Sequence, residues 1–479
     1  MLSEAEWLFE GISRLRADVV APLGFVIALA VTIHVLLNKR DVAAAIGWIG
    51  LAWLSPVLGG IVYFIFGVNR VRRRARQLRD GAADDGVPDA LPPAADRDPD
   101  LAPLELATRH LTRRPALAGN AVRLFRNGDQ AYPPMLEAIE AARESIALST
   151  YILHDDAAGA RFIDALIAAQ KRGIAVRVII DGIGSGYFSS APYRRLHHGG
   201  VPVQRFMHSP LPWRMPFLNL RTHKKVLLVD GRRGFAGGMN ISAQNLVATG
   251  PRHPVRDTHF SFDGPVVGQL AEAFAGDWEF LTGETLAGPA WFADVAPAGD
   301  AVARVVTSGP DEDIEKVELT VLQAVACARH SIRLMTPYFL PDERMMTALS
   351  LAATRGVAVE IVLPEVSDHR VIDWALRAHV GPLLEEGCRI WFNPPPFDHS
   401  KVLVVDGKWA LVGSANWDMR SFRLNFELTV ELYDQQVCAE LEAQIEAAKG
   451  KPLTLEALAA RPLPLRLLHA GTRLLLPYL

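Results

Sequence analysis

Hydrophobic positions dominate the beginning of the chain, where they form two nearly unbroken stretches, Val19–Leu37 and Val42–Val68. Each stretch approaches the roughly 20 residues that a helix needs to cross the hydrocarbon core of a bilayer. The polar break between them, Asn38–Asp41, is long enough only for a turn. The pattern predicts a transmembrane hairpin over residues 19–68, with helices at about 19–37 and 42–68, after an N-terminal segment of residues 1–18. A signal peptide is the alternative, and the acidic start of the chain argues against it.

A basic run follows the predicted hairpin, with six arginines between Arg70 and Arg79. Because positive residues favour the cytoplasmic side, this run predicts a cytoplasmic location for the bulk of the chain. It would also lie against anionic headgroups, so an anionic phospholipid membrane is an expected partner. Residues 69–107 are assigned to this basic juxtamembrane segment and a linker rich in Ala, Asp, Gly and Pro. We expect a multi-pass protein of the inner (plasma) membrane.

Beyond the linker the pattern changes to alternating strands and helices, and it occurs twice. Arg172–Ile180 is matched by Arg355–Leu363, and HKKVLLVDGRRGFAGGMN (His223–Asn240) by HSKVLVVDGKWALVGSAN (His399–Asn416). This order predicts an α/β fold of two pseudo-symmetric domains, residues 108–300 and 301–450. Each is expected to have a mostly parallel sheet covered by helices, and the two to pack face to face. Residues 451–479 form a C-terminal tail.

The amino-acid composition limits the classes of function that this protein can have. The 50 Lys and Arg residues nearly balance the 53 Asp and Glu residues, which excludes a protein that coats nucleic acid by bulk charge. We expect no nucleic-acid partner. The three cysteines are scattered without metal-ligand spacing and cannot form a disulfide framework. The sequence therefore predicts neither a metal site nor a disulfide-stapled fold.

The repeated motif carries the candidate chemistry. In the first copy His223 and Lys225 stand two apart before a predicted strand and so share a face, Asp230 follows at a turn, and Asn240 ends a glycine-rich loop. Imidazole, ammonium and carboxamide together suit a phosphate, because His attacks phosphorus or moves protons while Lys and Asn hold oxygens. The second copy has the same spacing, with His399, Lys401, Asp406, Ser414 and Asn416. Two copies predict a single site where both clusters surround one phosphorus.

With these motifs the sequence resembles the phospholipase D superfamily, whose signature His-x-Lys-x(4)-Asp-x(6)-Gly-Ser-x-Asn occurs twice. More narrowly it resembles the bacterial cardiolipin synthases, over nearly the whole chain. One departure is Gly238, where the signature has Ser. The further matching segments are Phe66-Gly67 before the arginine run, Asp181–Ser185, Arg256–His259, Asp277-Trp278, Thr336–Glu343, Asp418–Phe422 and Asn425–Glu427. The resemblance implies two phospholipase D-like αβα domains with the site at their interface.

The resemblance also implies a reaction. His223 would attack the phosphorus of phosphatidylglycerol and form a phosphatidyl-histidine, while His399 protonates the departing glycerol. His399 would then deprotonate a hydroxyl of a second phosphatidylglycerol, which takes the phosphatidyl group and gives cardiolipin. The transfer would be reversible and needs no cofactor or metal. The resemblance implies the catalytic residues His223, Lys225, Asp230, His399, Lys401 and Asp406, and the phosphate-binding residues Asn240, Asn416 and Ser414. The two lysines would also hold phosphoryl oxygens, and the role of the two aspartates would be mostly structural.

Two acidic residues follow the motifs at comparable distances. We expect Asp257 and Glu427 to orient the two histidines, without assigning either carboxylate to a particular histidine; an ordinary ion pair is the alternative. Two apolar segments, Met207–Leu220 and Pro462–Leu479, have compositions that suit a membrane interface. Core packing is the alternative for the first, and the prolines of the second weaken its case.

Other functions remain open at this point. Within the superfamily, a membrane-bound hydrolase would give the same intermediate to water, and another phosphatidyltransferase would give it to another acceptor. A nucleic-acid phosphodiesterase could use the same histidines, but the membrane hairpin argues against it. A non-enzymatic membrane scaffold is disfavoured because both motifs are intact except at Gly238. The sequence does not predict an oligomeric state.

Overall fold

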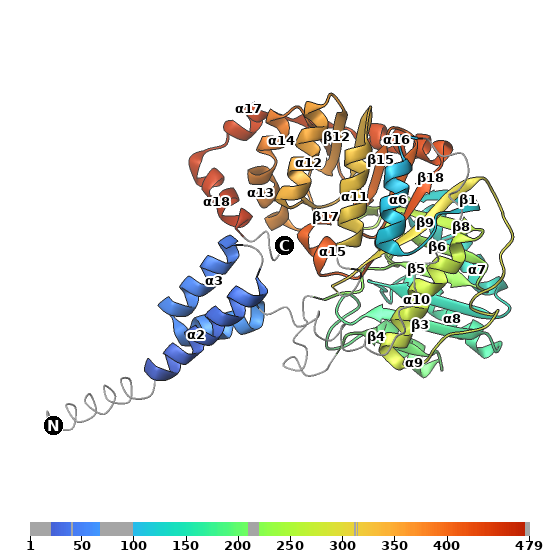
Figure 1. The fold of residues 1–479 in the computed structure, drawn as a ribbon. Helices are drawn as coiled ribbons and strands as arrows, with labels where there is room; N and C mark the ends of the chain where they lie inside the picture. The colour runs from blue at the N-terminus through green and yellow to red at the C-terminus, as the bar shows by residue number, and fades with distance from the viewer. Residues whose placement is uncertain are drawn as a thin grey trace, which may run out of the picture. The chain divides into compact units, whose positions relative to one another are not determined.

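The computed structural model describes residues 21–39, 42–67, 99–208, 220–310, 313 and 315–474. The chain divides into two compact units, Met1–Ala82 and Ala83–Leu479 (Figure 1). The predicted N-terminal segment, the arginine run, most of the linker and residues 209–219 of the predicted interfacial loop lie outside the described residues.

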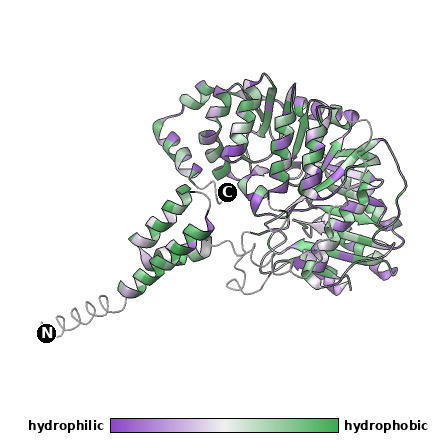
Figure 2. Ribbon diagram, in the orientation of Figure 1, coloured by the Kyte–Doolittle hydropathy of each residue, from purple (hydrophilic) through white to green (hydrophobic). Residues whose placement is uncertain are grey.

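The N-terminal unit is built from apolar helices, and Figure 2 shows hydrophobic residues along most of their length. The first, 18-residue helix is long and apolar enough to cross a membrane. The second predicted span is not one continuous helix, because it is interrupted at Ser55 (φ −145°, ψ 78°). Pro56 has no N–H to donate and disfavours helical dihedrals at the residue before it. The elements are α2 (Ala21–Asn38), α3 (Val42–Leu54), α4 (Pro56–Val62) and the π-helical turn η2 (Tyr63–Gly67).

The second unit starts with α6 (Ala102–Thr112), which packs against α11 of the second repeat. The first repeat then contains β1 (Leu117–Arg126), α7 (Asn127–Ala141), β2 (Ser145–Thr150), α8 (Gly159–Lys171), β3 (Ala175–Asp181), α9 (Ala191–His198), β4 (Val203–Phe206), β5 (Val226–Val229), β6 (Arg233–Gly237), η4 (Ala243–Asn245), η5 (Val247–Thr249), β7 (Val255–Arg256), β8 (Thr258–Asp263) and α10 (Val266–Thr282).

The second repeat follows the same order and adds a C-terminal extension. Its elements are β9 (Ala301–Ser308), α11 (Lys316–Cys327), β10 (Ser331–Met335), β11 (Phe339–Leu340), α12 (Glu343–Thr354), β12 (Ala358–Pro364), α13 (Arg370–His379), α14 (Gly381–Glu385), β13 (Arg389–Asn393), β14 (Phe397–Asp398), β15 (Val402–Val405), β16 (Trp409–Gly413), β17 (Trp417–Asp418), α15 (Met419–Arg423), β18 (Glu427–Tyr433), α16 (Gln435–Ala448), β19 (Lys451–Leu453), α17 (Leu455–Ala459) and α18 (Leu463–Arg473). The α/β class with two similar halves is therefore confirmed.

The two halves share one sheet, which corrects the expected face-to-face packing. Strands β1 and β9 pair antiparallel at the seam, with Asn120 opposite Ala301. This pairing satisfies backbone groups that would otherwise remain at two open sheet edges. The fifteen strands run in the order β19-β13-β12-β10-β15-β16-β18-β9-β1-β8-β6-β5-β2-β3-β4, so that the order in one half mirrors that in the other.

The sheet is also more antiparallel than predicted. Within it, parallel pairing among the described strands is confined to β2-β3-β4 and β10-β12-β13. The strands that follow the histidines, β5 and β15, instead enter hairpins with β6 and β16. Each hairpin turns at an Asp-Gly pair in which both residues have positive φ, 54° and 60° in the first copy and 53° and 64° in the second. Such turns connect antiparallel neighbours directly, without a crossover helix.

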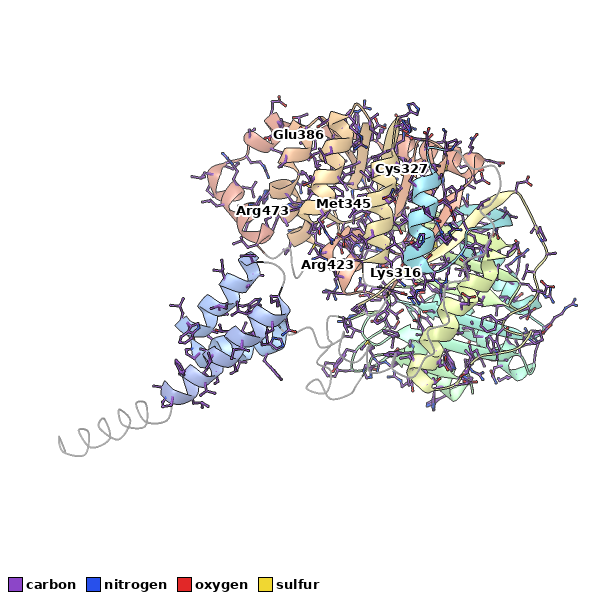
Figure 3. The ribbon with its side chains drawn as sticks, viewed as in Figure 1. Lys316, Cys327, Met345, Glu386, Arg423 and Arg473 are labelled. Carbon is purple, nitrogen blue, oxygen red and sulfur yellow. The ribbon has the colours of Figure 1, made fainter. Side chains whose placement is uncertain are left out.

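Helices cover the sheet on both faces, and one apolar core extends through both halves. Helices α10 and α16 pack into this shared core, together with strands of each repeat. On the second half a separate core lies beneath α11 and α12, where Met345 is fully buried; Figure 3 labels Met345 on α12 and Lys316 at the start of α11.

The predicted C-terminal tail belongs in part to the folded unit. Strand β19 pairs antiparallel with β13 and so extends the sheet beyond residue 450. Helix α18 contacts α13 and exposes several leucines, among them Leu463 (64%) and Leu467 (63%). The interfacial role of this segment stays a prediction, and its last residues, 475–479, lie outside the described part.

Candidate active site

The two motif histidines lie next to each other, with ring centroids 6.3 Å apart and ring planes at 85°. The opposite half holds the backbone of each. The N–H of His223 donates to the carbonyl of Phe426, and the N–H of His399 donates to that of Arg256, each at 2.8 Å. The site is therefore formed by the seam between the repeats, and neither half builds it alone.

Each histidine contacts a carboxylate of the opposite half. The Nδ1 of His223 lies 3.0 Å from Glu427 Oε2, and the Nδ1 of His399 lies 2.8 Å from Asp257 Oδ2. The structure thus gives the crossed assignment that the sequence left open. With Nδ1 bonded to a carboxylate, Nε2 is the ring nitrogen left for chemistry at phosphorus.

Burial controls the electrostatics of this cluster. Desolvation, reinforced by the two motif lysines, lowers the pKa of both histidines well below the usual value. Desolvation also lowers the pKa of Lys225 to about 7 and that of Lys401 to about 8. The same burial raises the pKa of Asp257 to about 6 and that of Glu427 to about 7. The pKa values of the two carboxylates and the two lysines, which normally lie far apart, therefore converge between about 6 and 8 around the histidines, as is typical of functional sites.

The lysines lie behind the histidines. Lys225 Nζ donates to the carbonyl of His223 at 2.7 Å, and Lys401 Nζ donates to the carbonyl of His399. Both side chains are almost fully buried. Their contribution to the site is positive charge beneath the imidazoles and a fixed conformation of the histidine backbone.

The two motif asparagines line the cavity beside the histidines. Asn240 Oδ1 accepts the N–H of Ile152 at 3.3 Å, which leaves its amide N–H groups as donors. Asn416 is buried, and its Oδ1 finds no hydrogen-bond partner among the residues that the structure describes. Both asparagines therefore line the same cavity as the two histidine rings.

Ser414 is placed differently from the expected phosphate ligand. Its fully buried hydroxyl donates to Glu427 Oε2 at 2.5 Å and accepts the N–H of Leu428 at 2.9 Å. Because a serine has a single hydroxyl proton, this contact removes it as a donor to phosphate. Ser414 instead holds the carboxylate that holds His223. Asn425 Nδ2 donates to the other oxygen of Glu427 at 3.1 Å.

The motif aspartates secure the turns rather than the reacting atoms. The carboxylate of Asp230 accepts the consecutive backbone N–H groups of residues 143–145, and that of Asp406 accepts those of residues 329–331. Each aspartate thereby fastens the far end of a motif strand to the start of β2 or β10. This is the structural role expected of them.

A cavity of about 850 Å³ opens above the histidines. Its lining includes side chains that the sequence analysis did not single out: Tyr151, Arg221, Tyr338, Asp368, Arg370, Phe397 and Arg420. The Tyr151 ring contacts His223 with centroids 5.0 Å apart, and the Tyr338 ring contacts His399 at 6.3 Å. The repeat aligns these two tyrosines and was the signal that could have found them. Among the described residues, no group of three or more His, Cys, Asp or Glu side chains could hold a metal ion.

Comparison with known proteins agrees with this architecture. A family model described as "Cardiolipin synthase, PLD-like domain" matches residues 135–278 and 321–449, and one described as "Phospholipase_D-nuclease N-terminal" matches residues 26–67. Cardiolipin synthase A of Pseudomonas aeruginosa is 36% identical over 436 residues, covering 89% of this chain and 87% of that protein. Cardiolipin synthase of Geobacillus sp. is 31% identical over 486 residues, covering 98% and 94%.

Among solved structures, phosphatidylserine synthase of Haemophilus influenzae is similar in fold, with a TM-score of 0.61 and 15% identity over 78% of this chain and all of that one (100%). The duplicated domain, the N-terminal match and the full-length relatives confirm the predicted resemblance and indicate membrane association. The chain therefore belongs to the cardiolipin synthase family of the phospholipase D superfamily and is a phosphatidyltransferase of that type.

Proposed function

We propose that this protein condenses two molecules of phosphatidylglycerol into cardiolipin and glycerol through a phosphatidyl-histidine intermediate. The observation that carries the proposal is the pair of imidazoles whose centroids lie 6.3 Å apart at the seam. Each is oriented by a buried carboxylate so that its Nε2 is available to the shared cavity. A tetrahedral phosphoryl group between the rings would meet a nucleophile on one side and a proton donor on the other.

In the first step, His223 Nε2 attacks the phosphorus of the donor lipid. An N–P bond forms, the bond from phosphorus to the headgroup glycerol oxygen breaks, and His399 gives that oxygen a proton. His399 enters this step protonated: the Asp257 carboxylate 2.8 Å from its Nδ1 and the bound anionic phosphate oppose the burial and the lysine charges that lower its pKa in the free site. Glycerol leaves, and the phosphatidyl group stays on His223. Glu427 stabilises the positive charge that develops on this imidazole, because its carboxylate lies 3.0 Å from Nδ1.

In the second step, the direction of proton transfer reverses. His399 takes the proton of a hydroxyl on the headgroup of a second phosphatidylglycerol, and that oxygen attacks phosphorus as the N–P bond breaks. Cardiolipin is released and both histidines return to their starting state. One phosphodiester replaces another, so the reaction consumes no nucleotide and runs in both directions.

The buried cations support both transition states. Lys225 and Lys401 place two positive charges under the phosphoryl group, and the asparagine amides supply hydrogen-bond donors to its oxygens. A fixed array of this kind lowers the barrier because it needs no reorganisation when charge moves. Ser414 and Asn425 act one step away, by holding Glu427 in the orientation that His223 requires.

We further propose that the catalytic unit faces the cytoplasm and that the N-terminal unit anchors it by more than one membrane-spanning segment. The length and apolarity of α2, the apolar α3 and α4, and the arginine run after residue 69 support this topology. Protease treatment of sealed inside-out vesicles should degrade the catalytic unit, and right-side-out vesicles should protect it. Protection in the inside-out preparation contradicts the cytoplasmic orientation.

The function is tested with purified full-length protein and phosphatidylglycerol labelled with ³²P. Wild-type protein should release glycerol and cardiolipin in equal amounts, and His223→Asn should abolish both. Rapid denaturation in detergent at mildly alkaline pH, where an N–P bond is stable, should trap labelled protein during turnover, and peptide mapping at the same pH should locate the label in the peptide with His223. Phosphatidic acid formed without cardiolipin identifies a hydrolase instead. Label in the peptide with His399 contradicts the assignment of the nucleophile.

A further inference from the structure

The catalytic cavity is chemically unequal at its two ends, although the motifs that form it are repeated. Arg221 stands two residues before His223, and the equivalent position before His399 is Phe397. Arg420 stands four residues after Asn416, and the equivalent position after Asn240 is Gln244. All four side chains line the cavity. At these equivalent positions one end therefore presents two guanidinium groups, and the other presents a phenyl ring and a neutral amide. The other part of the lining has one arginine, Arg370, together with the carboxylate of Asp368.

The two arginines act on one another and on the site. Burial lowers the pKa of Arg221, and the positive charge of Arg420 adds to this effect while Asp181 opposes it. Arg420 also contributes to the lowered pKa of His223, after desolvation and the two motif lysines. Like charges repel in this way only when they are close. The pair is thus a localised concentration of positive charge on the His223 side of the cavity.

Of the two acidic groups at this end, Asp181 lies beside Arg221 outside the cavity lining, and Asp418 lines the cavity together with the arginines. Asp181 is 1% exposed and lies 4.0 Å from Arg221 Nε, and its oxygens already accept the N–H groups of residues 183, 184 and 222. Asp418 is 3% exposed and accepts the N–H of Ser421 at the start of α15. Asp181 therefore restrains Arg221, while Asp418 caps the helix that carries Arg420. The lining at this end therefore carries two guanidinium groups against one almost fully buried carboxylate.

The proposed reaction requires more anion-binding capacity than the two motifs provide. Donor and acceptor each carry a phosphodiester, and in the product only a glycerol separates the two phosphates. While the first phosphate lies between the histidines, the second must lie within the same cavity. The motif lysines and asparagines serve the reacting phosphate, and a second anionic group needs its own cations in this desolvated place.

We propose that Arg221 and Arg420 bind the phosphodiester of the acceptor lipid, the phosphate that is not attacked. This inference rests on the proposed function and specifies its acceptor site. A guanidinium matches the geometry of phosphate oxygens with paired donors. Water and free glycerol carry no such group, so the arginine pair selects an anionic lipid headgroup over the two acceptors that compete with it.

The test compares acceptors that differ only in the second phosphate. Full-length protein is assayed in phosphatidylglycerol micelles with one of two labelled acceptors. Labelled glycerol gives labelled phosphatidylglycerol, and labelled glycerol 3-phosphate gives labelled phosphatidylglycerophosphate. Cardiolipin formation is measured in the same samples. Arg221→Gln and Arg420→Gln are compared with Arg370→Gln, which removes an arginine from the other part of the same cavity lining. Glycerol exchange also reports that each variant is folded and catalytically competent.

Both arginine variants should lower the ratio of cardiolipin formation to glycerol exchange by about 10- to 100-fold, because hydrogen bonds to charged groups contribute on this scale. Transfer to glycerol 3-phosphate should fall in parallel, and Arg370→Gln should keep the wild-type ratio. The proposal is overturned if glycerol exchange and cardiolipin formation fall equally, or if the ratio of cardiolipin formation to glycerol exchange does not change. It is also overturned if transfer to phosphatidylglycerol falls while transfer to glycerol 3-phosphate does not. If wild-type protein makes no cardiolipin, the proposed function itself fails.

Discussion

Asp257 Oδ1 lies 2.4 Å from the position that a Cβ atom on Gly238 would occupy. This oxygen accepts the N–H of Thr258 at 2.7 Å. In the second half the equivalent N–H, that of Leu428, donates to the hydroxyl of Ser414 at 2.9 Å. An aspartate oxygen in one half thus replaces a serine oxygen in the other. Two differences between the halves therefore belong together: Gly238 replaces the serine of the signature, and Asp257, which contacts His399, stands where the second half has Glu427.

This relationship predicts that the missing serine cannot simply be restored. Gly238→Ser should force Asp257 away from His399 and lower kcat by at least about tenfold, the loss expected when one charged hydrogen bond is broken. Gly238→Ser combined with Asp257→Glu recreates the pair of the second half and should recover most of the rate. Steady-state cardiolipin synthesis measures both. Gly276→Ser, at an exposed helical position with open space around the Cβ, is the control. An unaffected Gly238→Ser protein contradicts the prediction.

The pH dependence should be bell-shaped and narrow. The free enzyme needs ionised Glu427 and Asp257, whose pKa values burial raises to about 7 and 6, so kcat/KM falls as the pH drops through this range. It also needs protonated Lys225 and Lys401, whose pKa values burial lowers to about 7 and 8, so kcat/KM falls again above these values. Bound phosphate favours the protonated lysines and should move the alkaline limb of kcat upward.

The variant Lys225→Arg tests whether the deprotonation of Lys225 causes the fall of kcat/KM at alkaline pH. Arginine stays protonated throughout the accessible range, so only the titration of Lys401 should remain and the limb of kcat/KM should move toward higher pH. Profiles of kcat/KM between pH 5 and about 10 measure this shift. An alkaline limb that is identical in the two proteins would assign it to another group.

Neutralising a motif lysine should reduce turnover strongly. Lys401→Met removes one of the two buried charges beneath the phosphoryl group and should lower kcat by about 10²- to 10³-fold, as loss of a preorganised stabilising group does elsewhere. Single-turnover rates with labelled phosphatidylglycerol measure the chemical step directly. Lys171→Met, at an exposed position of α8, is the matched control and should retain the wild-type rate. A comparable loss in both variants would indicate a nonspecific effect.

A buried ion pair at the seam should govern stability. Arg304 of β9 is fully buried, and its Nε donates to Glu431 Oε1 at 2.6 Å. Arg304→Met leaves a buried carboxylate without its cation and should lower the free energy of unfolding by about 3–5 kcal/mol. Arg304→Met with Glu431→Leu should recover most of this loss. Denaturant unfolding in detergent measures each variant.

The matched control for the buried ion pair of Arg304 and Glu431 is an ion pair on the protein surface. Arg233 and Asp263 form an ion pair with side chains 53% and 32% exposed. Arg233→Met should cost at most about 1 kcal/mol, because solvent screens such pairs. Equal costs at the two positions would contradict the importance assigned to burial at the seam.

Much of the site could be predicted because its chemistry is repeated. His223 and His399 stand in copies with identical spacing, and the turn aspartates follow them at a fixed offset. The break at Ser55 was also visible in principle, since Pro56 is a strong local signal. The predicted span of residues 42–68 followed apolar length alone and ignored that proline.

The other features of the fold and the site depend on contacts between residues far apart in the sequence, which the local pattern of hydrophobic and polar positions does not encode. Strand β1 is partly exposed and strand β9 is buried along almost its whole length, and nothing in either sequence marks them as partners across the seam. Arg420 lies in the matching segment Asp418–Phe422 and Arg221 in none, and only the fold places the two in one cavity. The crossed contacts of Asp257 and Glu427 follow from the same seam, which is why their partners could not be assigned beforehand.

The pairing of β9 with both β18 and β1 has a consequence for substrate exchange. If the two repeats rotated apart, the main-chain hydrogen bonds in the middle of the sheet would break. The apolar core that both halves share would then be exposed to solvent. Such a rupture is far too costly to occur in every turnover. The enzyme must therefore load and discharge its lipids with a stationary framework, past the cavity rim where His369 is largely solvent-exposed (65%).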